Sequence, residues 1–120
     1  MSDAELRKKL RGYLRSFRLC QSQAKDIETM IKRGEVADCV LADLNKARDE
    51  FMLHCVNVRR IIGYTSGLEH RVLTSLFILG KKPECVAREV NYSQGYISNL
   101  EGKALKKLCR NKDVINLIVQ

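Results

Sequence analysis

The chain has 120 residues, of which 45% are hydrophobic and 30% are charged, with one proline and seven glycines. This composition is typical of a folded, helix-rich protein and excludes a disordered chain. The formal net charge of +8 favours an anionic partner such as nucleic acid. The longest apolar stretches, 72–79 and 114–119, are too short to span a bilayer, and the N-terminus has no signal-peptide pattern. We therefore expect a cytoplasmic protein with no membrane partner.

Apolar residues in the first half of the chain predict two long helices. From Leu6 to Ile31 they alternate spacings of four and three, a heptad seam that ends before Gly34, a residue suited to a helix C-terminus. A second seam runs from Ala37 to Ile61. We expect an antiparallel hairpin with arms of about 40 Å, packed on the rest of the chain or on a second copy.

Three shorter helices are predicted after the hairpin. The glycine-bracketed linker GYTSG comes first, and Ser66 with Glu69 matches a capping box that begins a helix. Gly80 would end this helix, and Pro83 suits the first turn of the next. The three predicted helices span residues 66–79, 83–90 and 93–110.

Residues 83–102 meet the physical demands of a helix-turn-helix. Two helices that cross steeply need a small residue at the crossing, which is Ala87, and a turn residue that accepts left-handed backbone angles, which is Asn91. Ser93 suits the cap of the second helix. The positions predicted to point inward are Val86, Val90, Tyr92, Ile97 and Leu100. The alternative is a structural helix pair, which would usually fail at the small residue or the turn.

The stretch VAREVNYSQGYISNLEGKALKKL resembles region 4 of sigma-70-type sigma factors, the module that reads the upstream promoter element. The resemblance covers about residues 66–110. Gly95 and Gly102 depart from it, because that family usually has charged or long polar residues there. With a long hairpin before it, the motif looks like the small late-gene or autolysin regulators of Gram-positive phages and prophages. This resemblance implies a role in transcription and a contact between the hairpin and RNA polymerase.

The start of the last predicted helix would enter the major groove, as in other helix-turn-helix proteins. The predicted base-reading residues are Ser93, Gln94, Tyr96, Ser98 and Asn99. Their amides can pair bidentately with adenine, the hydroxyls can contact bases or phosphate, and the tyrosine ring can pack on sugar or a thymine methyl. Gly95 either lets the DNA backbone approach closely or simply tolerates a first-turn position.

Basic residues flank the predicted base-reading positions. The predicted phosphate contacts are Lys81, Lys82, Lys103, Lys106, Lys107 and Arg110. The N-terminal segment adds six cations with no acidic residue among them: Arg7, Lys8, Lys9, Arg11, Arg15 and Arg18. In an antiparallel hairpin these six would lie beside Arg59 and Arg60, next to the helix-turn-helix. This basic end is either a clamp on the DNA backbone or a solvated helix face.

No arrangement of residues points to an enzyme, a metal site or a cofactor. Five cysteines lie at wide spacings with no Cys-x-x-Cys pair, and we expect small buried hydrophobes: Cys20, Cys39, Cys55, Cys85 and Cys109. His54 and Cys55 are helical neighbours about 100° apart and cannot form a nucleophile–base pair. His54 falls on the apolar seam and is expected to be packed, while His70 is expected to be exposed.

The apolar tail DVINLIVQ, residues 113–120, has two interpretations. Five of its eight residues are Val, Ile or Leu, so it either caps the core of the monomer or pairs with a second chain. The benefit of two half-sites to a helix-turn-helix protein favours a homodimer.

The sequence thus predicts an all-α protein: a coiled-coil-like antiparallel hairpin over 1–62, a helix-turn-helix unit over 66–110 and an apolar tail over 111–120. The predicted function is sequence-specific binding of double-stranded DNA in transcription regulation. Two alternatives are a DNA packaging or recombination accessory with the same motif, and a helical protein–protein adaptor whose main module is the hairpin.

Overall fold

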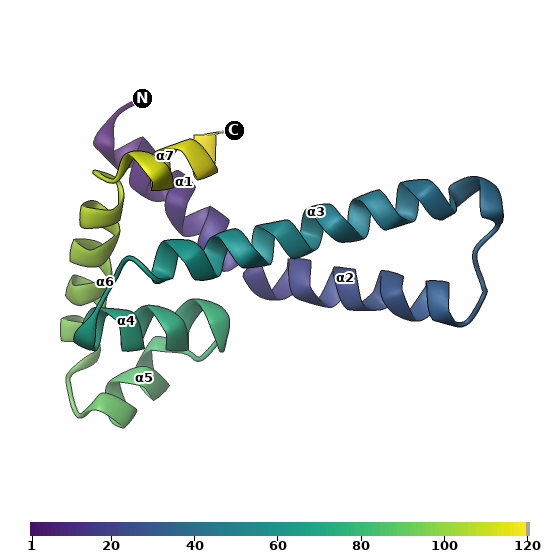
Figure 1. The fold of residues 1–120 in the computed structure, drawn as a ribbon. Helices are drawn as coiled ribbons and strands as arrows, with labels where there is room; N and C mark the ends of the chain where they lie inside the picture. Colours follow the sequence, from purple (N-terminus) through teal and green to yellow (C-terminus); the bar gives the residue numbers. More distant parts are fainter. Residues whose placement is uncertain (120) are drawn as a thin grey trace.

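The computed structural model describes residues 1–119 as helices joined by short loops, with no strand in that range (Figure 1). The elements are α1 (Asp3–Arg15), α2 (Phe17–Lys32), α3 (Asp38–Ile62), α4 (Gly67–Leu73), a π-helical turn η1 (Thr74–Ile78), α5 (Pro83–Val90), α6 (Gln94–Leu108) and α7 (Lys112–Val119). The all-α fold is therefore confirmed. Gln120, the last residue of the predicted tail, lies outside the described residues.

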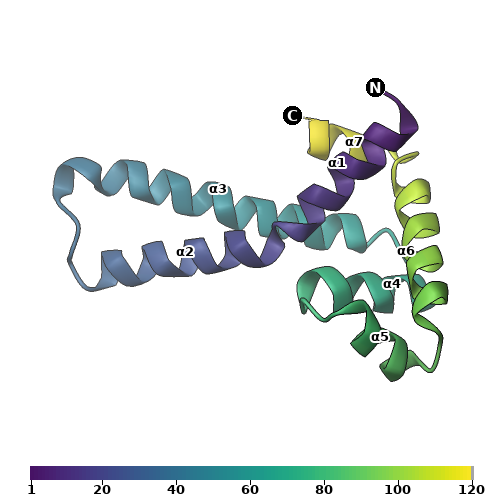
Figure 2. The same cartoon turned by 180° about the vertical axis from the view of Figure 1, so that it is seen from behind.

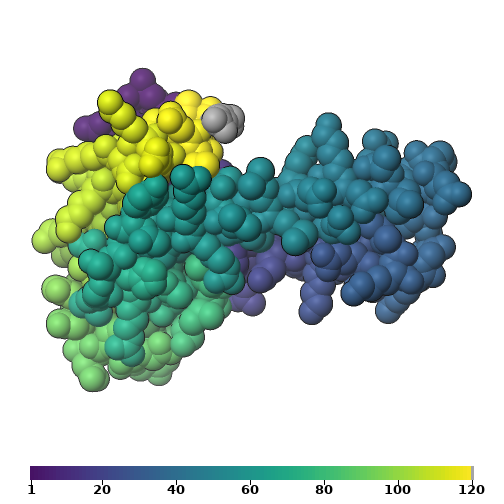
Figure 3. All heavy atoms as spheres, viewed as in Figure 1, coloured from purple at the N-terminus to yellow at the C-terminus, as the bar shows by residue number. Residues whose placement is uncertain are grey.

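The hairpin consists of α2 and α3 and projects from a head formed by the other helices (Figures 1 and 3). Gly34, with φ +67°, ends the first arm as predicted. The 25 residues of α3 span about 37 Å, close to the predicted arm length, whereas the 16 residues of α2 span only about 24 Å. The predicted first arm was too long, because its first half is a separate helix.

A bend at Ser16 separates α1 from α2, so the single helix predicted for the first seam is wrong. Ser16 Oγ donates a hydrogen bond to the Tyr13 carbonyl over 2.9 Å, and His54 Nε2 lies 2.9 Å from the same oxygen. Since a carbonyl only accepts, His54 bonds to it in the tautomer that carries a proton on Nε2. Serine bonds to carbonyls of the preceding turn bend helices. The bend carries α1 away from the hairpin and onto α6 and α7 (Figure 2).

One core joins the hairpin, the C-terminal helices and the tail. Its buried residues are Leu10, Leu14, Phe17, Val58, Ile61, Ile62, Leu73, Phe77, Ala104, Leu105, Leu108, Val114 and Ile118. The predicted ranges 1–62, 66–110 and 111–120 all contribute side chains to it. Beyond this core, the hairpin is a two-helix layer. Within the described part of α2 and α3, Ala24 is the only buried residue that does not belong to the core.

The tail forms α7, and its apolar side chains face the core. Val114 and Ile118 are buried there, alongside residues of α1 and α6. Of the two interpretations, this placement agrees with a cap on the monomer core. The buried side of α7 is therefore not free to pair with a second chain.

The helix after the linker begins at Gly67, but the predicted capping box does not form. The Ser66 side chain makes no capping hydrogen bond. The Glu69 carboxylate instead accepts a hydrogen bond from Lys107 Nζ at 2.8 Å, because α4 packs beside α6. Glu69 therefore links α4 to α6 and does not cap α4.

We expect His54→Ala to destabilise the protein by about 1–3 kcal/mol, because the Tyr13 carbonyl would lose one of its donors and the imidazole packing would be lost. Leu53→Ala is the matched control, since Leu53 is 58% exposed on the same helix. Urea unfolding followed by circular dichroism measures both. Equal costs for the two variants would show that His54 does not hold the bend.

Candidate nucleic-acid interface

The turn between α5 and α6 has the geometry of a helix-turn-helix. Asn91 adopts φ 61° and ψ 39°, the left-handed conformation predicted for this position. The Tyr92 N–H donates to the Ala87 carbonyl over 3.1 Å and closes the turn. Ala87 is buried where the helices cross, together with Val72, Val86 and Ile97. Val90 and Leu100 are half-buried against this cluster, in agreement with the predicted inward positions.

Ser93 caps α6 as predicted, since its hydroxyl accepts a hydrogen bond from the Tyr96 N–H at 3.1 Å. The inward position predicted for Tyr92 is wrong. This side chain is 47% exposed and stacks on the Tyr96 ring, with 4.4 Å between the ring centroids. Each ring covers one face of the other, so two tyrosines stay exposed at the start of α6 without contacting the core. The pair forms an aromatic surface beside the cap.

The five predicted base-reading residues are all exposed: Ser93, Gln94, Tyr96, Ser98 and Asn99. Ser98 and Asn99 border a groove of about 300 Å³ between α6 and α1. Gly102 lies in its lining, and a Cβ there or at Gly95 would meet no atom within 4 Å. Packing within the chain therefore does not demand either glycine.

Three of the predicted phosphate contacts lie close to these residues. Lys103 and Lys106 line the groove, and Arg110 lines a small adjoining cavity with Lys106. Three others lie elsewhere. Lys107 Nζ pairs with Glu69 and Lys81 Nζ pairs with Glu89, each at 2.8 Å, while Lys82 is exposed at the N-terminus of α5.

Cations of α1 lie beside α6, an arrangement that the sequence did not predict. They were predicted to lie beside Arg59 and Arg60, but the bend at Ser16 directs α1 onto α6. Arg7 lines the groove, and Arg11 Nε donates to Glu101 Oε1 of α6 at 2.8 Å. Arg59 instead lies over the Phe17 ring, 5.1 Å from its centroid. The one sequence signal for this arrangement was Ser16, a weak helix former within the seam, whereas its contact with His54 at 3.0 Å is visible only in the structure.

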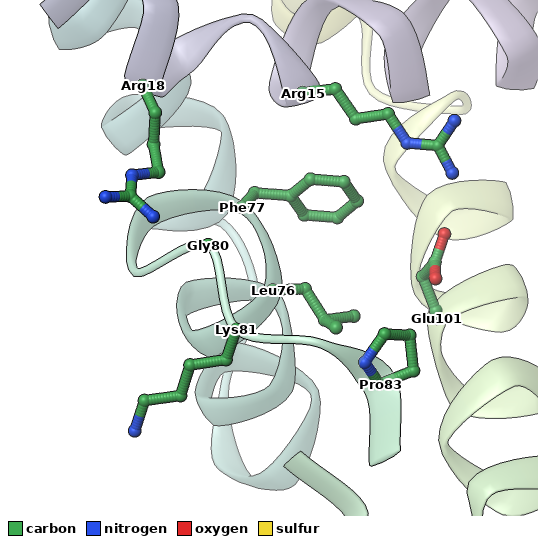
Figure 4. Close-up of a pocket in the computed structure, with 8 residues that line it drawn as sticks. All are labelled: Arg15, Arg18, Leu76, Phe77, Gly80, Lys81, Pro83 and Glu101. Atoms are coloured by element: carbon green, nitrogen blue, oxygen red, sulfur yellow. The ribbon is translucent and has the colours of Figure 1, made fainter. Parts of the chain in front are cut away.

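A second cavity, of about 210 Å³, lies where the head meets the base of the hairpin (Figure 4). Arg15, Arg18 and Lys81 give it a positive charge, and Arg15 points toward Glu101. Arg18 Nη1 donates to the Leu79 carbonyl at 3.2 Å and fills the space beside Gly80, where a Cβ would collide with the guanidinium. Arg18 therefore joins α2 to the loop that precedes the helix-turn-helix.

The cysteines and histidines differ in how far they are buried. Burial raises the pKa of the Cys20, Cys55 and Cys109 thiols, so they stay protonated near neutral pH. Cys39 is exposed and the other four cysteines are half-buried, so the expectation that all five are buried is wrong. His54 is half-buried, as its position on the seam suggested, and His70 is exposed as expected.

Residues 1–119 contain neither a cluster of metal ligands nor a membrane-spanning helix. No group of three or more His, Cys, Asp or Glu side chains there is placed to hold a metal ion. No helix in the same range has both the length and the apolar character needed to cross a membrane.

Comparisons of the chain with known protein families, with characterised proteins and with solved structures find no match.

We expect Ser93→Ala to lower the free energy of unfolding by about 1 kcal/mol, because the cap at the Tyr96 N–H would be lost. Ser98→Ala is the matched control on the same helix, since no hydrogen bond holds its exposed hydroxyl within residues 1–119. Chemical denaturation measures both. A cost for Ser98→Ala as large as that for Ser93→Ala would contradict the capping role.

Proposed function

We propose that the protein binds double-stranded DNA in a sequence-specific manner and regulates transcription, with α6 in the major groove. The observation that carries the proposal is the exposed start of α6 behind a left-handed turn and a serine cap. Ser98 and Asn99 there adjoin a groove that also contains three cations. Helix-turn-helix proteins present this part of the second helix to base edges. A surface with both amides and cations provides for base reading and for phosphate binding.

The two glycines of α6 support the same interpretation. Gly102 costs about 1 kcal/mol relative to alanine because it lies in the helix interior, and neither Gly102 nor the first-turn Gly95 is required by a neighbouring atom. Gly95, Asn99, Gly102 and Lys106 follow one another at spacings of four, three and four, so they share one face of the helix. A face without Cβ atoms at two positions lets a DNA strand approach the helix backbone closely.

The resemblance to small phage regulators adds RNA polymerase as a proposed partner of the hairpin, and such a function belongs in the cytoplasm with the DNA. A homodimer would need an interface other than the buried side of α7. A packaging or recombination accessory would use the same DNA-binding surface, so only the identity of the bound sequence distinguishes it from a regulator.

The adaptor alternative is favoured by one observation on the hairpin. A groove of about 350 Å³ runs between α2 and α3, with an apolar floor and a charged rim. The floor contains Ala24, Met52, Cys55 and Val56, of which Val56 is 59% exposed. An exposed apolar surface of this kind is typical of a site that binds another protein.

Selection from a random duplex library, followed by titration of the recovered duplex at several salt concentrations, tests the proposal. We expect a recovered motif, and a log affinity that falls with log salt by about 0.9 for each phosphate neutralised. Weak binding to every duplex, with no recovered motif, would favour the adaptor. A palindromic motif would indicate a dimer on DNA.

We expect Asn99→Ala to weaken binding to the recovered duplex by about 1–3 kcal/mol and to leave binding to unrelated duplexes unchanged, because Asn99 would read a base. Asn116→Ala, an exposed asparagine on α7, is the matched control. Fluorescence anisotropy measures both variants. An equal loss on all duplexes would contradict a base-reading role for Asn99.

A further inference from the structure

The groove between α1 and α6 is lined by cations without a carboxylate. Arg7 comes from α1, while Lys103 and Lys106 come from α6, and the rest of the lining is Ser98, Asn99 and Gly102. The adjoining cavity shares Arg7 and Lys106 and adds Arg110, with Asp3 as the one acidic residue. Like charges held this close repel one another, so the arrangement favours the binding of an anion.

Arg7 has a nitrogen that lacks an acceptor. Its Nε is buried and has no hydrogen-bond partner within residues 1–119. Arg11, one helical turn later, differs because its Nε donates to Glu101. A buried donor without an acceptor is rare and destabilising, and no carboxylate of residues 1–119 pairs with Arg7 as Glu101 pairs with Arg11.

Gly102 keeps the groove open. It lies in the lining between the cations, and a Cβ at this position would meet no atom of the chain within 4 Å. A larger residue at position 102 would thus fit the fold while projecting into the groove. The glycine leaves room for something that is not part of this chain.

We propose that Arg7, Lys103 and Lys106 bind a backbone phosphate of the same duplex whose bases α6 reads, which makes α1 a second DNA-contacting element. This inference rests on the proposed function. A guanidinium presents several donors in one plane and suits phosphate oxygens, and the two ammonium groups add charge. Ser98 and Asn99 border the groove, so a phosphate bound there lies next to the strand whose bases these residues face.

Titration of the recovered duplex with charge-matched variants tests this site. Arg7→Gln removes one positive charge from the groove, and Lys46→Gln removes one from an exposed position on α3. We expect Arg7→Gln to weaken binding about tenfold and to reduce the salt slope by about 0.9, whereas Lys46→Gln changes neither appreciably. Arg7→Lys should restore part of the affinity, since it restores the charge without the planar donors.

Gly102→Leu fills the groove without changing any charge. We expect it to weaken duplex binding while thermal unfolding shifts to an equal or higher temperature, because leucine favours a helix more than glycine does. Thermal unfolding of Arg7→Gln should likewise show no loss of stability, since Arg7 Nε has no internal partner. Duplex affinity at the wild-type level in both variants would overturn the proposal.

Competition by inorganic phosphate separates the two sources of the anion. At constant ionic strength, we expect phosphate to displace the duplex from the wild type more effectively than chloride does, and this difference to disappear in Arg7→Gln. A phosphate effect that depends on Arg7, together with an Arg7→Gln variant that binds the duplex as tightly as wild type, would mean a free-phosphate site and overturn the proposal. Equal losses for Arg7→Gln and Lys46→Gln would do so too, while leaving DNA binding intact. A wild-type protein without salt-dependent duplex binding would instead remove the proposed function itself.

Discussion

The carbonyl of Tyr13 is the point on which the arrangement of the molecule depends. It accepts a hydrogen bond from the Ser16 hydroxyl and another from His54 across the hairpin, each at 2.9 Å. These bonds hold the chain where α1 turns away from α2. Without the turn, the apolar seam would continue along α3, and α1 could not cover α6. The position of the α1 cations relative to α6 follows from this one bend.

The shared core makes the bend stable. Leu10 and Leu14 of α1 are fully buried against residues of α6 and α7, including Leu105 and Val114. Each such aliphatic side chain contributes about 1.5–3 kcal/mol when it leaves water. The helix-turn-helix has its own small cluster around Ala87, whose buried residues are distinct from those of the larger core. The small cluster packs α5 against α6, and the larger core holds α1 beside α6.

The local features of the fold could be predicted from the sequence because each depends on a few neighbouring residues. Gly34 as a helix end, Asn91 in the left-handed turn and Ser93 as a cap are all present in the structure.

The features that depended on distant partners could not be predicted. A heptad seam has the same sequence pattern whether its helix is straight or bent. The bend depends on His54, which contacts Ser16 from 38 residues further along the chain. Glu69 matched a capping box, yet its actual partner, Lys107, lies on another helix. The base-reading candidates could be chosen from the sequence because they lie on one short helix, whereas the position of Arg7 beside α6 appeared only in three dimensions.

The contact between α1 and α6 also determines when the surface can form. Arg11 and Glu101 are 90 residues apart in the chain, so α1 is synthesised well before the helix that it packs against. During translation α1 emerges with its apolar side uncovered, and its final partners follow only after most of the chain has been made. Contacts of such long sequence separation form late, because a large loop must close first. A ribosome-bound fragment that lacks α6 and α7 would therefore hold the hairpin but not the basic groove, and the surface proposed for DNA exists only once α6 has joined α1.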